Sequence, residues 1–182
     1  MESIEFGAGS VLIAEPFLQD PHFGRAVVLL CHYDEEGAFG LVLNKRGLNP
    51  FEGSEHPLSG FPFFKGGPVE TSSMFFVHQL QGLPESQNLR DGICWQGRYE
   101  DLLEAVQARE FEPANCRLLM GYSGWEKGQL EGEIQREDWM VYNGPISGLL
   151  RLPAETMWKD LLKKMGPYYK MVSNFPTDPS LN

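Results

Sequence analysis

The feature of this sequence that most constrains its fold is that its apolar residues occur in short runs, each closed by turn-forming residues. Residues 27–31 are apolar throughout, residues 34–37 read Asp-Glu-Glu-Gly, and residues 38–44 are again mostly apolar. Runs of this length are too short for a typical helix, and valine and leucine suit a buried strand. The pattern predicts a β-hairpin whose four-residue loop is formed by residues 34–37.

Three other apolar runs predict further strands. They lie at residues 10–14, 74–78 and 117–120. The last run leads into the segment Gly-Tyr-Ser-Gly-Trp at residues 121–125, whose two glycines can adopt conformations closed to other residues. We therefore expect the chain to turn at residues 121–125.

Apolar residues at helical spacing predict helices at residues 99–110, 128–134 and 154–165. The third pattern is the clearest. Gly166 follows it and Pro167 prevents its continuation, as is typical of a helix C-terminus.

The sequence shows no internal domain boundary, so residues 1–182 are expected to form a single domain. Residues 46–64 are rich in glycine, proline, serine and asparagine and are expected to form a loop excursion. Residues 175–182 are expected to form an extended tail. Because strands and helices are interspersed and a hairpin is present, the predicted fold is an α/β (α+β) sandwich with a mixed β-sheet and packed helices.

The charge and cysteine content limit the possible partners and location. The chain carries 15 basic and 25 acidic residues, a net charge of −10. Direct nucleic-acid binding is therefore disfavoured, because it depends on Lys and Arg meeting phosphates. No apolar stretch approaches the roughly 20 residues of a membrane span. The N-terminus has no signal-peptide pattern, and the three widely spaced cysteines suit a reducing compartment, so we expect a cytoplasmic protein.

Several separated segments together resemble the AlgH/YqgE family of bacterial proteins, in order along nearly the whole chain. They are GSVLIAEP at residues 9–16, DPHF at 20–23, GAFGLVLN at 37–44, GGPV at 66–69, GYSGW at 121–125, GQLE at 128–131 and DPSLN at 178–182. The resemblance implies an α/β sandwich with a mixed sheet in a cytosolic protein. The family takes its name from a proposed role in regulating alginate production, which would imply an indirect regulatory function. Lys45 and Arg46 stand where an Arg-Pro-like pair is more typical.

No complete catalytic or metal-binding signature is present. A nucleophile elbow needs glycine two places after the serine, but Trp125 stands two places after Ser123. The Gly66–Gly67 segment lacks the lysine and hydroxyl residue of a phosphate-binding loop. The histidines and cysteines do not cluster, so no metal or cofactor is expected. We expect Asn44 to hydrogen-bond the backbone of the loop that follows it.

The first functional hypothesis is a non-catalytic binding or regulatory protein. Its partner would be a protein or a small molecule, and the chain itself would be a monomer or weak oligomer. The recognition surface would be framed by the glycine loop and by the two aromatic residues of the 121–125 segment. The candidate binding residues are Asn44, Gly66, Gly67, Pro68, His78, Tyr122, Trp125 and Gln129.

The alternative is a small-molecule-binding protein or hydrolase-like enzyme whose cleft contains His78 and Ser123. It requires the two side chains to converge within a few Å in one pocket. The acidic residues between positions 126 and 138 are expected to form a solvated face that is able to bind a basic partner.

Overall fold

Nine strands form one sheet in the computed structural model, which describes residues 5–177. In chain order the strands are β1 (Val11–Ala14), β2 (Val27–Asp34), β3 (Gly37–Val42), β4 (Phe63–Lys65), β5 (Val69–His78), β6 (Gln87–Asn88), β7 (Cys94–Trp95), β8 (Cys116–Glu126) and β9 (Trp139–Tyr142). The helices are α1 (Tyr99–Gln107), α2 (Gln129–Gln135), η1 (Leu149–Arg151), α3 (Ala154–Lys164) and α4 (Pro167–Val172).

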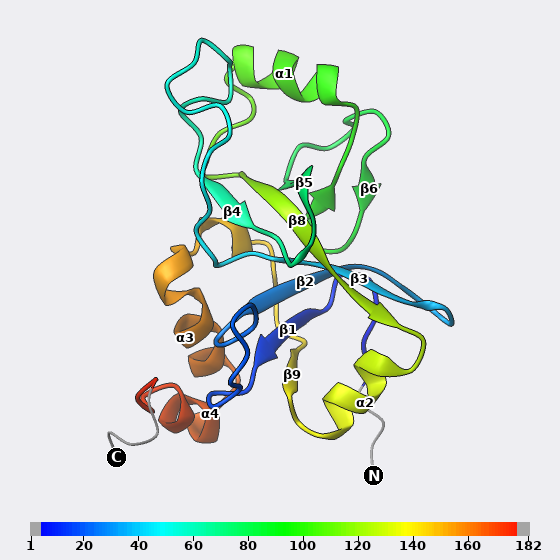
Figure 1. Cartoon of the computed structure of the whole chain (residues 1–182), viewed down its shortest axis with the longest axis vertical. Coiled ribbons are helices and arrows are strands. Elements are labelled where there is room, and N and C mark those ends of the chain that lie inside the picture. Colours follow the sequence, from blue (N-terminus) through cyan, green and yellow to red (C-terminus); the bar gives the residue numbers. More distant parts are fainter. Residues whose placement is uncertain (1–4, 178–182) are drawn as a thin grey trace.

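The sheet has two halves that share β8 (Figure 1). The strand order is β6-β7-β5-β8-β3-β2-β1-β9, and β4 also pairs with β8. The first part of β8 pairs with β4 and β5 near α1, and its last part pairs with β3 near α2. The β4–β8 pair is parallel and the others are antiparallel, so the predicted mixed sheet with packed helices is confirmed.

The predicted hairpin forms, but its loop is shorter than expected. Strand β2 continues to Asp34, which pairs with Gly37, so that only two residues connect the strands. A register irregularity between Leu30 and His32 lets the strand continue beyond its apolar run. The prediction of a four-residue loop was wrong because polar residues at an exposed strand end look like turn residues in sequence.

The predicted turn at residues 121–125 is wrong, because these residues belong to β8. Gly121 has φ 75°, which lets the strand bend without ending. Beyond the bend, Ser123 pairs with Gly40 and Gly124 pairs with Phe39. The two glycines therefore allow one strand to pass from one half of the sheet to the other.

The other predicted elements appear close to their expected positions. The strand at residues 10–14 is β1, and the helices at residues 99–110, 128–134 and 154–165 are α1, α2 and α3. The loop expected at residues 46–64 consists of turns, bends and one isolated bridge up to residue 62, and β4 includes its last two residues. Of the expected tail, residues 175–177 contain no helix or strand and residues 178–182 lie outside the described part. Within residues 5–177 no helix has the length and apolar character required to cross a membrane.

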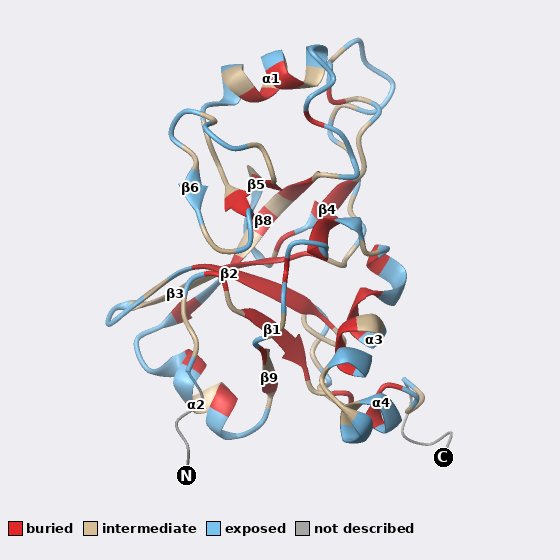
Figure 2. Cartoon of the chain, turned by 180° about the vertical axis from the view of Figure 1, so that it is seen from behind, coloured by how far each residue is buried: buried red, intermediate tan, exposed pale blue. Residues whose placement is uncertain are grey.

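Helices on both sides of the sheet complete three apolar clusters. Helix α3 buries Met157, Trp158, Leu161 and Leu162 against β1 and β2, as the red inner side of the helix shows in Figure 2. Helix α2 closes a second cluster that contains Trp125 and Trp139. Helix α1 covers a third cluster in the other half of the sheet.

The two halves meet where the backbone of one glycine pair lies directly against β8. An added Cβ on Gly66 would lie 2.2 Å from the carbonyl oxygen of Gly121, and one on Gly67 would lie 2.1 Å from the carbonyl carbon of Tyr122. The Gly66 N–H donates to the carbonyl of Met120 (2.8 Å), and the Gly66 carbonyl accepts the N–H of Val42 (2.8 Å). No side chain larger than hydrogen fits at either glycine without moving the backbone.

Replacing Gly121 with alanine should destabilise the protein by two effects that a control can separate. Gly121 has φ 75° and an added Cβ would lie 2.6 Å from the Gly67 carbonyl oxygen, whereas Gly128 has φ 76° and no atom within 4 Å of an added Cβ. We expect Gly128→Ala to cost about 1 kcal/mol of unfolding free energy from backbone strain alone. Gly121→Ala should cost at least about 2 kcal/mol more from the added clash. Urea denaturation measures both, and equal losses would contradict the close packing.

Candidate functional site

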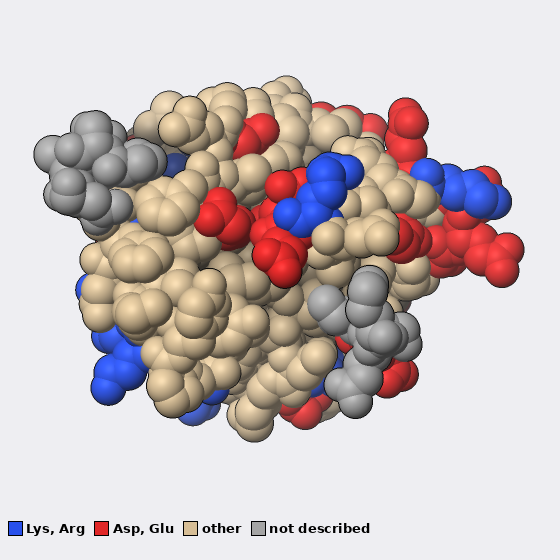
Figure 3. Space-filling model, turned by 90° about the horizontal axis from the view of Figure 1, so that it is seen from below, with Lys and Arg blue, Asp and Glu red and all other residues tan. Residues whose placement is uncertain are grey.

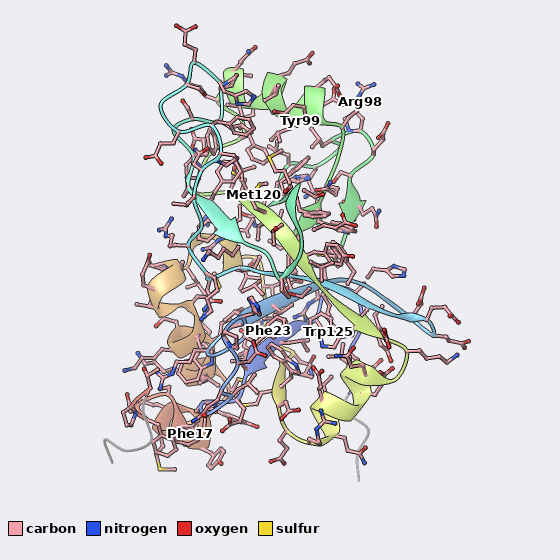
Figure 4. The ribbon with its side chains drawn as sticks, in the orientation of Figure 1. Phe17, Phe23, Arg98, Tyr99, Met120 and Trp125 are labelled. Carbon is pink, nitrogen blue, oxygen red and sulfur yellow. The ribbon has the colours of Figure 1, made fainter. Side chains whose placement is uncertain are left out.

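A groove of about 830 Å³ opens beside this glycine contact, between the two halves of the sheet. Four parts of the chain form it: the loop after β1, the segment that leaves β3, the segment from β4 to β5, and β8. Figure 4 labels Met120, which contributes to the groove from β8 beside β4. The lining residues are Pro21, His22, Val42, Asn44, Lys45, Arg46, Gly47, Leu48, Pro50, Phe64, Lys65, Gly67, Pro68, Thr71 and Met120.

The groove is basic although the chain as a whole is acidic. Lys45, Arg46 and Lys65 line it, and its lining includes no Asp or Glu among the residues described. The chain carries a net charge of −10. A concave site lined by charges of one sign concentrates its field, so this groove favours anionic groups locally.

Lys45 is one of the residues that line the groove, and it is half-buried. Its ammonium donates a hydrogen bond to the carbonyl of Gly24. Burial lowers the pKa of Lys45, and the nearby positive charge of Arg25 lowers it further. Both effects destabilise the charged form of Lys45, and an anion in the groove would offset them.

Arg46 and Arg117 stabilise the walls of the groove. Their guanidinium carbons lie 4.9 Å and 4.6 Å from the ring centroid of Phe64. Arg46 also forms a 3.0 Å ion pair with Glu155 at the start of α3. These contacts occupy Arg46, so Arg46 is less available to a ligand than the lysines are.

Arg117 is only 4% exposed and connects the two halves of the sheet. Its guanidinium donates to the carbonyls of Leu43, after β3, and Leu152, before α3. Burial lowers the pKa of Arg117 to about 10, with a smaller contribution from Arg46. Arg117 thus stays protonated at neutral pH and keeps both hydrogen bonds.

Lys65 is the basic residue of the groove that is most available to a ligand. It is exposed at the end of β4 and forms no ion pair with any residue in the range 5–177. Its backbone N–H donates to the carbonyl of Lys45 (2.8 Å), which fixes the two lysines on neighbouring segments. The pair therefore presents two positive charges on a rigid backbone frame.

Four of the predicted binding residues lie at this groove or directly behind it. Asn44, Gly67 and Pro68 line the groove, and Gly66 packs behind it between β3 and β8. The Asn44 side chain bonds the backbone N–H of Val27 (2.8 Å) and the carbonyl of Arg25 (2.9 Å). Its partners thus lie at and just before the start of β2. The prediction that Asn44 would bond the loop that follows it was wrong.

The other predicted binding residues lie elsewhere. Tyr122 stacks on Phe39 with ring centroids 4.7 Å apart, within an apolar cluster. Trp125 is 6% exposed, and its indole N–H donates to Glu133 (2.8 Å). Gln129 donates to the same carboxylate (2.9 Å). The structure therefore brings the two glycine segments together but directs Trp125 into the core beneath α2 (Figure 4).

His78 and Ser123 do not share a pocket. Both are fully buried, but His78 pairs with Cys116 on β8, and Ser123 lies seven positions further along that strand. At about 3.3 Å per residue, this places them on the order of 20 Å apart. The Ser123 hydroxyl donates to the carbonyl of Gly66 (3.2 Å). This geometry contradicts the predicted cleft with a His78–Ser123 pair, because acid–base partners must be in hydrogen-bond reach.

Sequence reasoning missed the lysines that line the groove. The sequence feature that could have indicated them is a Lys-Arg pair directly after one predicted apolar strand, together with a lysine directly before the Gly-Gly pair. These segments became neighbours only through the bridge between Arg46 and Phe64 and the parallel pairing of β4 with β8. Among residues 5–177, no group of three or more His, Cys, Asp or Glu is arranged to hold a metal ion.

The buried His78 should make stability depend on pH. Its Nδ1 accepts the N–H of Leu80 (3.2 Å) and its Nε2 lies 2.9 Å from the carbonyl oxygen of Gln96, a pattern that suits the neutral ring. Burial lowers the pKa of His78 below its usual value of 6.5. The unfolded chain therefore binds this proton first, and unfolding free energy should fall as pH drops below about 6.5.

The measurement is urea denaturation of the wild type and of His78→Gln between pH 7.5 and pH 5. We expect the variant to be less stable at pH 7.5 but to lose less stability on acidification than the wild type does. Identical pH dependence in the two proteins would contradict a neutral buried histidine.

Comparisons with known proteins agree with this fold. The chain matches the AlgH-like family over residues 11–170. It is 38% identical over 178 residues to a UPF0301 protein from Cytophaga hutchinsonii, covering 96% of this chain and 98% of the relative. The solution structure of the AlgH protein from Pseudomonas aeruginosa is similar with a TM-score of 0.72 and 27% identity, covering 97% of each chain. A crystal structure of protein DIP2367 from Corynebacterium diphtheriae shares the fold with a TM-score of 0.77 and 24% identity, covering 96% of this chain and 95% of that one. The chain belongs to the AlgH-like family.

Proposed function

We propose that this chain is a non-catalytic binding protein of the cytosol, and that its groove binds a small ligand with an anionic group and an apolar body. The observation that carries the proposal is the pair of lysines, Lys45 and Lys65, in a groove that no carboxylate of residues 5–177 lines. Opposite charge in a concave site gives both attraction and orientation.

The apolar lining and the size of the groove define the rest of the ligand. Val42, Leu48, Phe64 and Met120 contribute apolar surface. The volume of about 830 Å³ lies within the range of small-molecule sites, which are mostly apolar with a few polar groups. Leu48 is 86% exposed, so a ligand that covers it would remove apolar surface from water.

A binding role agrees with the surroundings of the groove better than a catalytic one does. Asn44 and Arg46 are occupied by contacts with the protein itself. His22 lines the groove, and no side chain within residues 5–177 is hydrogen-bonded to its ring as a nucleophile would be. Any regulatory effect would then pass through a partner protein, because a net charge of −10 disfavours direct contact with DNA.

The charge of Lys65 should contribute measurably to this binding. The probe is hexanoate, with neutral hexanamide as its matched control, titrated against ¹⁵N-labelled protein. We expect hexanoate to shift the amide signals of Lys45, Gly47 and Gly67, and hexanamide to bind more weakly. Lys65→Gln should raise the Kd for hexanoate about two- to fivefold, as expected for one exposed charge.

The matched control is Lys164→Gln, which removes an exposed lysine at the end of α3 away from the groove lining. It should leave the Kd unchanged. Equal effects of the two variants, or amide shifts confined to other parts of the protein, would show that the groove does not bind anions specifically.

A further inference from the structure

Strand β9 forms one edge of the sheet. It pairs with β1 from Ala14–Trp139 to Val11–Tyr142 and stands last in the strand order. In Figure 1 it lies between α2 and α4, on the opposite end of the molecule from α1. Its outer side faces no other strand in the described part of the chain.

Two residues of β9 direct their backbone polar groups outward. The Glu15 N–H donates to the carbonyl of Asp138 (3.0 Å), which fixes the alternation of the antiparallel pair. Counting along β9 from that bond, Met140 and Tyr142 face β1, and Trp139 and Val141 direct their N–H and C=O groups away from it. An unpaired edge of this kind is a template for another strand.

A hollow of about 630 Å³ runs along this edge. Trp139, Met140 and Val141 all line it. Because neighbouring strand residues point to opposite faces, a hollow that touches all three follows the strand edge and not one face of the sheet. Tyr169 and Val172 of α4 form its apolar wall.

The charges around this hollow are the reverse of those in the basic groove. Glu5, Glu15 and Glu137 line it, and no Lys or Arg of residues 5–177 does. Figure 3 views the molecule from this end and shows acidic side chains in the middle of the face, with a basic side chain among them, beside a broad uncharged surface. The edge therefore offers backbone hydrogen bonds, apolar surface and negative charge together.

We propose that β9 binds an extended segment of a partner protein as an added strand, and that this segment carries basic and apolar side chains. Four residues of the partner would match the length of β9. Backbone hydrogen bonds would supply affinity, chiefly at Val141, which is partly exposed whereas Trp139 is 3% exposed, and the three glutamates would select basic side chains. This site is separate from the groove and does not depend on its function.

Charge decides between such a partner and a second copy of this chain. Pairing β9 with the β9 of another copy would place the glutamates of both copies on one short interface. Like charges facing one another across a strand pair are destabilising. A basic segment has the opposite charge and avoids this repulsion.

The test uses the full chain and a rhodamine-labelled peptide of alternating valine and lysine, six residues long with blocked ends. Fluorescence anisotropy should show binding that weakens with salt, and the valine–glutamate analogue should bind at least about tenfold more weakly. Equal binding of the two peptides would overturn the proposal. A dimer that the valine–lysine peptide dissociates would also overturn it, because the edge would then already bind a second copy.

Val141→Pro removes one outward N–H, and proline is tolerated at a sheet edge. It should raise the Kd of the valine–lysine peptide about threefold to tenfold, the effect of one hydrogen bond. Glu137→Gln should raise it about two- to fivefold, and Glu104→Gln on α1, at the far end of the molecule, should have no effect.

Two results keep the test independent of the folding of Val141→Pro. The variant must still unfold cooperatively in urea, which shows that the chain is folded without reference to the groove. On the wild-type chain, N-methylation of alternate peptide residues should abolish binding in one register and spare it in the other, because an added strand bonds its neighbour through every second residue. Binding that depends on Glu137 but is insensitive to Val141→Pro and to N-methylation would overturn strand addition.

Discussion

The structure depends on the direct backbone contact between Gly66 and Gly67 on one side and Gly121 and Tyr122 of β8 on the other. This contact lies where β8 leaves one set of neighbours and joins another. It places the β4–β5 connection against the end of β3, and the space left beside it is the basic groove. A side chain at any of these glycines would separate the two halves and change the groove with them. The fold and the candidate site thus share one steric requirement.

The positively charged side chains near the groove have two different roles. Arg117 and Arg46 are held by Phe64, by backbone carbonyls and by Glu155, and they stabilise the junction between β3, β8 and α3. Within the described residues, the side chain of Lys65 makes no such contact, and that of Lys45 makes one hydrogen bond, to the carbonyl of Gly24. The two arginines therefore stabilise the fold, and the two lysines are left to contact a ligand.

Local sequence patterns predicted the helices and strands well where the apolar residues followed a single helical or strand-like spacing. Helix α3 and strand β1 follow directly from their apolar spacing, and the mixed sheet follows from the hairpin at β2 and β3. The same reasoning failed at residues 121–125, because glycine permits both a turn and a bent strand, and only the neighbours of β8 decide between them. It also failed for the His78–Ser123 pair and for the lysines of the groove. In each case the distance between two residues is set by strand pairings far apart in sequence, which no local pattern encodes.

The position of β8 in the chain has a consequence for biosynthesis. Strands β3 and β5 are both neighbours of β8, yet both precede it in the sequence. Until the residues from Cys116 onward have been made, the edges of β3 and β5 that face β8 in the folded protein have no partner. The eleven-residue segment β8 then supplies a partner to both edges, and β9 is added to β1 only afterwards. The long-range pairing that joins the two halves of the sheet can therefore form only after most of the chain has been translated.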